Sequence, residues 1–215
     1  MTNRPGLRTA LAWSALGLVA LGPVAIAAAS PLLAWRGAAY IAGGFAGILC
    51  LSLLLVQPLL AAGYLPGPTP VTARRWHRRI GAAIVVCVAV HVGGLYLTSP
   101  PDTLDALLLV SPTPFSVYGV TAMWAILQTA LLVLLRRRMA SGRWRIWHNA
   151  LALVAVVATV VHAVQIEGAM GPISKWILCI ATLLATGTAL VDMRVIRPLR
   201  RRARAAGSPE TDARG

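Results

Sequence analysis

Six long stretches without a single charged residue constrain this chain more than any other feature. They span residues 9–35, 37–73, 80–101, 106–135, 146–166 and 176–191. A helix needs about 20 apolar residues to cross a bilayer, and the stretches lack the apolar–polar alternation of membrane strands. Divided at Pro66, Pro68, Pro100, Pro101, Pro112 and Pro114, they predict membrane spans near 9–29, 38–62, 79–98, 116–136, 146–165 and 172–193.

The composition excludes an ordinary soluble domain. Only 12% of the 215 residues are charged and 58% are hydrophobic, whereas soluble domains carry about 25% charged residues. The predicted fold class is therefore all-α, an integral membrane bundle of six transmembrane helices. Residues 1–8 form a short N-terminus and residues 9–193 the six-span domain, while 194–215 form a basic tail that we expect to be disordered.

The basic residues are distributed unevenly along the chain. Eighteen of the 20 lysines and arginines lie before span 1, between spans 2 and 3, between spans 4 and 5, or after span 6. Only Arg36 and Lys175 lie on the other connections, together with Asp102, Asp105 and Glu167. Because cytoplasmic loops carry such an excess, both termini are predicted to face the cytoplasm. The net charge of +14 then indicates a lipid bilayer, and not nucleic acid, as the partner.

The first span has an alternative interpretation. Arg4, Arg8, an apolar run and the sequence AIAAAS also fit a signal peptide with a small-residue cleavage site. We expect a retained span, because the apolar run is longer than the core of a usual signal peptide. The three cysteines (Cys50, Cys87 and Cys179) form no CxxC pair and are expected to be buried apolar residues.

All four histidines of the chain fall into one repeated pattern. The stretch from Trp76 to His91 reads WHRRIGAAIVVCVAVH and that from Trp147 to His162 reads WHNALALVAVVATVVH, so both have the form W-H-x13-H. Fourteen residues turn a helix through about 1400°, which is about 40° short of four full turns. The two imidazoles of each span therefore share a face and differ in height by about 21 Å. Spans 3 and 5 run in the same direction, which brings His77 level with His148 and His91 level with His162.

Two imidazole pairs at two heights predict two stacked haems between spans 3 and 5. Each iron would take one axial ligand from each span, and two strong axial ligands suit the transfer of single electrons better than oxygen binding. A tetrahedral zinc or copper site needs converging ligands, which pairs about 21 Å apart cannot supply. Hydrogen bonding between helices explains any one of these histidines, but not four of them in two identical spacings.

Residues beside the histidines fit the same interpretation. Gly81 follows His77 by four residues, where a flat macrocycle needs a small side chain. Arg78, Arg79 and Arg145 lie where they could neutralise the propionates of an inner haem. Ordinary helix packing and the topological role of basic residues account for these positions equally well.

The segments RRWHRRIGAAIVVCVAVH and SGRWRIWHNALALVAVVATVVH resemble the paired-histidine spans of the ferric reductase-like transmembrane domain superfamily. This superfamily includes iron reductases, NADPH oxidases and the haem-binding subunit of the periplasmic methionine sulfoxide reductase system, to which the chain is similar in size. The resemblance covers spans 2–6. It implies two b-type haems, bound by His77, His91, His148 and His162, that carry electrons outward across a bacterial inner membrane. The N-terminal half of cytochrome b has comparable histidine pairs, but its other sequence features are not found here.

The resemblance also guides expectations about partners. Many family members continue into a flavin- and nicotinamide-binding domain, whereas only 22 residues follow from Arg194, too few for a dinucleotide fold. Electrons are therefore expected from a cytoplasmic flavoprotein reductase or from quinol, with ferric iron or a partner reductase as the acceptor at the outer face. FMN or a quinone as an additional cofactor stays open. The competing function is a haem-free membrane subunit or a transporter, but transporters usually carry charged residues at mid-membrane, and these spans carry none.

The distribution of basic residues generates a first prediction. Because 18 of the 20 basic residues lie on alternate connections, reporter fusions after Arg204 should behave as cytoplasmic and fusions at Thr103 as external. Paired phosphatase and fluorescent-protein fusions measure both positions. The reverse pattern of signals would contradict the orientation and exchange the two faces of the bundle.

Overall fold

The computed structural model describes residues 5–206, which form helices and connections without any strand. The long helices are α1 (Pro5–Ala28), α2 (Ala38–Ala62), α3 (Pro70–Thr98), α5 (Pro114–Leu134), α6 (Ser141–Gln165) and α7 (Pro172–Val191). Shorter elements are η1 (Pro31–Leu33), α4 (Pro100–Leu107), η2 (Leu135–Arg138), the π-helical turn η3 (Asp192–Ile196) and α8 (Arg197–Ala206).

Six helices in this part of the chain are long and apolar enough to cross a membrane, which confirms the predicted class of helical integral membrane protein. The second span agrees with its predicted bounds of 38–62 at both ends. The third begins earlier than predicted, because Thr69 caps the helix by accepting a hydrogen bond from the Thr72 backbone N–H and Pro70 occupies the first turn.

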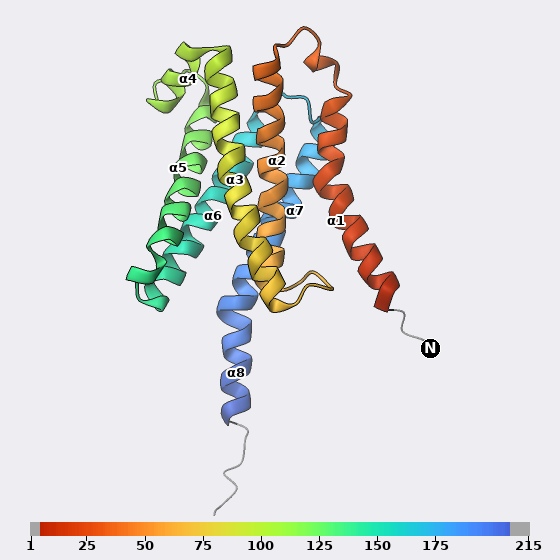
Figure 1. Cartoon of the computed structure of the whole chain (residues 1–215), viewed down its shortest axis with the longest axis vertical. Coiled ribbons are helices and arrows are strands. Elements are labelled where there is room, and N and C mark those ends of the chain that lie inside the picture. The colour runs from red at the N-terminus through yellow and green to blue at the C-terminus, as the bar shows by residue number, and fades with distance from the viewer. Residues whose placement is uncertain (1–4, 207–215) are drawn as a thin grey trace, which may run out of the picture.

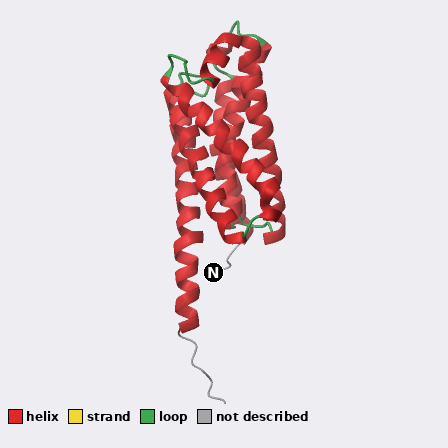
Figure 2. Cartoon of the chain, turned by 90° about the vertical axis from the view of Figure 1, so that its left-hand side faces the viewer, coloured by secondary structure: helices red, strands yellow, loops and turns green. Residues whose placement is uncertain are grey.

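The long helices run side by side and alternate in direction (Figures 1 and 2). The connections rich in arginine lie at one end of the bundle, at the bottom of Figure 1, together with the start of α1 and with α8. The opposite end carries α4. Within the bundle α3 packs mainly along α2, and α6 mainly along α5, while α7 contacts both α2 and α6.

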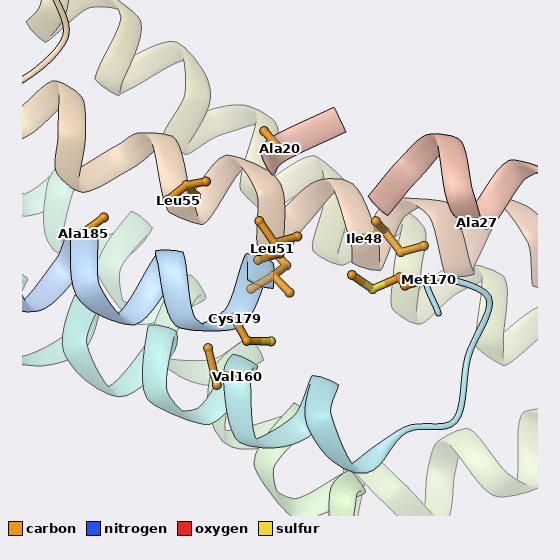
Figure 3. Packing of buried hydrophobic residues seen from close by; sticks show 10 residues of the cluster. Ala20, Ala27, Ile48, Leu51, Leu55, Val160, Met170, Cys179 and Ala185 are labelled. Carbon is orange, nitrogen blue, oxygen red and sulfur yellow. The ribbon is translucent and has the colours of Figure 1, made fainter. Parts of the chain in front are cut away.

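The main apolar core lies where α1, α2, α6 and α7 meet (Figure 3). Leu51 and Leu178 are among its fully buried side chains. Ser52 is buried beside this core and its hydroxyl donates to the Ala20 carbonyl at 2.7 Å, which ties α1 to α2. Of the three cysteines, Cys50 and Cys179 are buried and free, as expected, whereas Cys87 is only half-buried.

Two segments differ from the sequence-based expectation. The prolines at 100 and 101 begin a helix, α4, instead of only ending the preceding span, because proline is tolerated in the first turn. In the tail expected to be disordered, residues 197–206 form α8, and residues 207–215 lie outside the described part of the chain. Arginine and alanine favour helix, and Arg197 fixes the start of α8 through the Asp192 carboxylate at 2.8 Å and the Ala62 carbonyl at 2.6 Å.

The contact between α2 and α3 generates a prediction about stability. A Cβ atom at Gly94 would lie 2.6 Å from the Ala39 carbonyl oxygen and 2.9 Å from the Gly43 Cα, whereas one at Gly93 would meet nothing within 4 Å. Gly94→Ala is therefore expected to lower the free energy of unfolding by about 1–3 kcal/mol, since the two backbones must separate.

Gly93→Ala is the matched control and should leave the free energy of unfolding unchanged or slightly raised. Unfolding in mixed detergent micelles of increasing denaturing-detergent content measures both variants. Similar destabilisation by the two substitutions would contradict the close approach of α2 and α3 at Gly94.

Candidate functional site

The four histidines meet in the two pairs that their spacing predicts. The ring centres of His77 and His148 are 6.3 Å apart with 62° between the ring planes. The ring centres of His91 and His162 are also 6.3 Å apart, with 80° between the planes. In each pair one ring comes from α3 and the other from α6, although these two helices make few other direct contacts.

The distance within each pair fits two ligands on opposite sides of one metal ion. A metal–imidazole bond is about 2.0 Å long, and the ligating nitrogen lies about 1.1–1.2 Å from its ring centre, so the two ring centres would be about 6.3 Å apart. A direct hydrogen bond between the rings would bring the centres to within about 5.5 Å. Both observed pairs therefore match metal ligation and are too widely spaced to bond to each other.

Backbone carbonyls orient three of the four imidazoles. The Nδ1 atom of His91 lies 2.8 Å from the Gly43 carbonyl of α2, and that of His162 lies 2.8 Å from the Phe115 carbonyl of α5. A carbonyl oxygen can only accept, so each Nδ1 carries the proton and each Nε2 keeps its lone pair for a metal. Such outer partners are the usual way in which ligating histidines are oriented.

Two glycines allow neighbouring helices to support the rings of His91 and His162, here called the outer pair because it lies away from the arginine-rich end of the bundle. A Cβ atom at Gly47 of α2 would lie 2.9 Å from His91 Nδ1, and one at Gly119 of α5 would lie 2.7 Å from His162 Cε1. Both distances are shorter than real Cβ contacts, so no other residue fits at either position without displacing a ring. The outer imidazoles are therefore fixed both by a hydrogen bond and by close packing.

His77 and His148, the inner pair at the arginine-rich end, are held differently. His77 Nδ1 lies 3.2 Å from the Gln57 carbonyl, and the Gln57 side-chain amide donates back to the His77 carbonyl at 3.2 Å. The Nδ1 atom of His148 is buried and has no hydrogen-bond partner among the described residues. Its ring instead stacks on Trp144, with the ring centres 4.9 Å apart and 15° between the planes.

An apolar cluster separates the two levels. Ile84 lies seven residues from both histidines of α3, and Ala155 lies seven residues from both histidines of α6. These two residues belong to one buried cluster with Cys50, Leu54, Ala125, Ile126 and Val156, contributed by α2, α3, α5 and α6. A buried apolar layer therefore lies midway between the pairs.

The other predicted site residues lie around the inner end of the bundle. Gly81 faces α2, since a Cβ atom there would lie 3.1 Å from the Gln57 amide nitrogen. Arg78 and Arg79 are exposed and line an open groove of about 410 Å³ with Arg75 and Ala82. Arg145 is exposed and bonds to the Ser141 carbonyl at 3.2 Å. The structure thus places Gly81 at the contact between α3 and α2, and the three arginines on the exposed surface at the arginine-rich end.

Several residues of the site were not predicted from the sequence. Gln57, Gly43 and Phe115 act through backbone carbonyls, which every residue has, so their identities do not reveal which histidine they orient. Gly119 also belongs to no sequence pattern that would reveal its role. Two patterns were informative: Gly43 and Gly47 form a GxxxG pair, and Trp144 precedes His148 by one helical turn.

Neither a protein-family model, nor a curated protein, nor a solved structure matches this chain. Within residues 5–206 no three His, Cys, Asp or Glu side chains come together as a metal site, so each level offers one imidazole pair as its donor set.

The contact at Gly119 generates a prediction about ligand binding. Gly119→Ala is expected to turn the His162 ring away from His91 and from the Phe115 carbonyl. Under the haem ligation expected from the sequence, affinity of the outer pair for an iron porphyrin should then fall about 10- to 100-fold, as when an outer partner of a metal ligand is lost. Absorbance titration of the purified protein measures this affinity.

Gly44→Ala is the matched control, because a Cβ atom at Gly44 would meet nothing within 4 Å. Its affinity should equal that of the unchanged chain. An unchanged affinity in Gly119→Ala as well would contradict a supporting role for this glycine.

Proposed function

We propose that this chain is a membrane b-type cytochrome that carries electrons through two haems, from a cytoplasmic flavoprotein or quinol to an acceptor at the outer face. The observation that carries the proposal is the pair of matched imidazole sites. Both have ring centres 6.3 Å apart, the spacing for opposite ligands of one metal, and they lie at two heights along the same two helices.

The donor atoms fit this cofactor. His77, His91 and His162 each donate a hydrogen bond from Nδ1–H to a carbonyl, which leaves Nε2 as the ligating atom and fixes the rotation of the ring. A haem held by two histidines changes its iron between two oxidation states and so supplies one-electron chemistry without an open position for oxygen.

The remaining residues would confine this chemistry to the two sites. The buried cluster that contains Ile84 and Ala155 excludes water between the levels. The levels are about 21 Å apart along each helix, so one site lies near each face of the bundle. An electron that passes from one site to the other therefore crosses most of the apolar layer.

The basic end of the bundle supports a donor on the cytoplasmic side. Arg75, Arg78 and Arg79 line an open groove there, and the arginines of α8 are exposed. Such a surface attracts an acidic flavoprotein and also anionic lipid. Under this proposal the donor reaches the pair formed by His77 and His148, which is the nearer pair to this surface.

Haem content tests the proposal. The purified chain is expected to bind two b-type haems, and His91→Ala should bind one, because only the inner pair stays complete. Pyridine haemochrome analysis per mole of protein, together with oxidised and dithionite-reduced spectra, measures both values.

Gln165→Ala, one turn beyond His162 on an exposed position, is the control and should keep both haems. A chain without haem would refute the proposed function. Two haems retained in His91→Ala would refute the assignment of ligands while leaving the cytochrome in place.

A further inference from the structure

His148 is the exception among the four imidazoles. The other three each place Nδ1 on a carbonyl of a neighbouring helix, at 2.8–3.2 Å. His148 Nδ1 is buried without such a partner in the described chain. A ligating histidine normally relies on that bond to fix its tautomer and its ring rotation, so another group has to orient this ring.

The group in contact with the ring is Trp144. It precedes His148 by four residues on α6, and side chains at this spacing lie on the same side of a helix. The nearly parallel stack, 4.9 Å between centres, leaves the imidazole little freedom to rotate. The guanidinium carbon of Arg136, from η2, lies 5.0 Å from the centre of the Trp144 ring. We call Arg136, Trp144 and His148 the inner stack.

The chain offers a contrast that shows the stack is specific. Trp147 is adjacent to His148 in the sequence, but its side chain is 58% exposed. Trp144 is half-buried, and its Nε1 atom is buried without a hydrogen-bond partner among the described residues. An indole whose N–H gains no partner is held by its ring contacts, and the ring contacts of Trp144 are His148 and Arg136.

We propose that Trp144 is a positioning residue for His148, with its indole in the role that a backbone carbonyl has for the other three histidines. This inference rests on the proposed function.

The inner stack also has an electronic consequence. An imidazole whose Nδ1–H has no acceptor is a weaker electron donor to its metal, and the nearby positive charge of Arg136 likewise stabilises the iron that has gained an electron. Both effects favour the reduced state, so the inner pair has the higher reduction potential.

The test uses backgrounds that isolate each pair. His91→Ala leaves only the inner pair complete, and His77→Ala leaves only the outer pair. Adding Trp144→Leu is expected to lower haem content several-fold in the first background and to leave it unchanged in the second. Adding Trp144→Phe should preserve the haem in the first background, because a flat ring remains against His148. Trp147→Leu is the control and should leave the haem content of both backgrounds unchanged.

Loss of haem to the same extent in both backgrounds, or in neither, would overturn the proposal. So would equal behaviour of Trp144→Leu and Trp144→Phe. If a background variant does not fold, Trp144→Leu in the otherwise unchanged chain decides instead, with a fall from two haems to one as the expected result and two haems as the contrary one. A haem-free unchanged chain would refute the proposed function itself.

A potentiometric titration tests the electronic part separately. Arg136→Gln should lower the midpoint potential of one haem, that of the inner pair, and leave the other unchanged. Arg137 is the adjacent exposed arginine, and Arg137→Gln is the matched control. It should shift the midpoint potential of the inner haem less than Arg136→Gln does. Equal shifts from the two substitutions would show that general surface charge, and not the inner stack, sets the potential.

Discussion

The hydrogen bond between an imidazole and the backbone carbonyl of a neighbouring helix is the interaction on which the rest of this bundle depends. A polar ring in an apolar layer is costly unless it is bonded, and a helical carbonyl can accept a second bond beside its own intrahelical one. His77 and His91 use the Gln57 and Gly43 carbonyls of α2, and His162 uses the Phe115 carbonyl of α5. Each bond requires a close approach of two helices, which is why glycines lie at the contacts.

This requirement pairs the helices that carry histidines with helices that supply carbonyls. α3 packs along α2 and α6 packs along α5, while α7 contacts both α2 and α6 and joins them in the main core with α1. Histidines from α3 and α6 face each other at two levels, on either side of the cluster around Ile84 and Ala155. The geometry of each pair is thus set by the helices behind it, and a buried apolar layer separates the two pairs.

The two levels are not equivalent, and the difference follows from their surroundings. The outer rings are fixed by carbonyls and by glycine contacts from α2 and α5. The inner level lies next to the arginine-rich end, where His148 has an aromatic neighbour under a guanidinium group instead of a carbonyl. The two sites therefore differ in local charge and in the groups that hold their rings, although the four ligands are chemically identical.

The sequence alone determined the number of spans, because length and the absence of charge are sufficient to identify a membrane helix. It also determined which histidines pair, because the x13 spacing fixes face and height on two parallel helices. The tertiary structure alone decided what holds each ring: Gly47, Gly119 and the three carbonyls act through distances between helices, and backbone acceptors have no signature in residue identity. It also decided that the last helix continues through residues 197–206, since Arg197 bonds to the nearby Asp192 carboxylate and to the Ala62 carbonyl, which lies 135 residues away in the sequence.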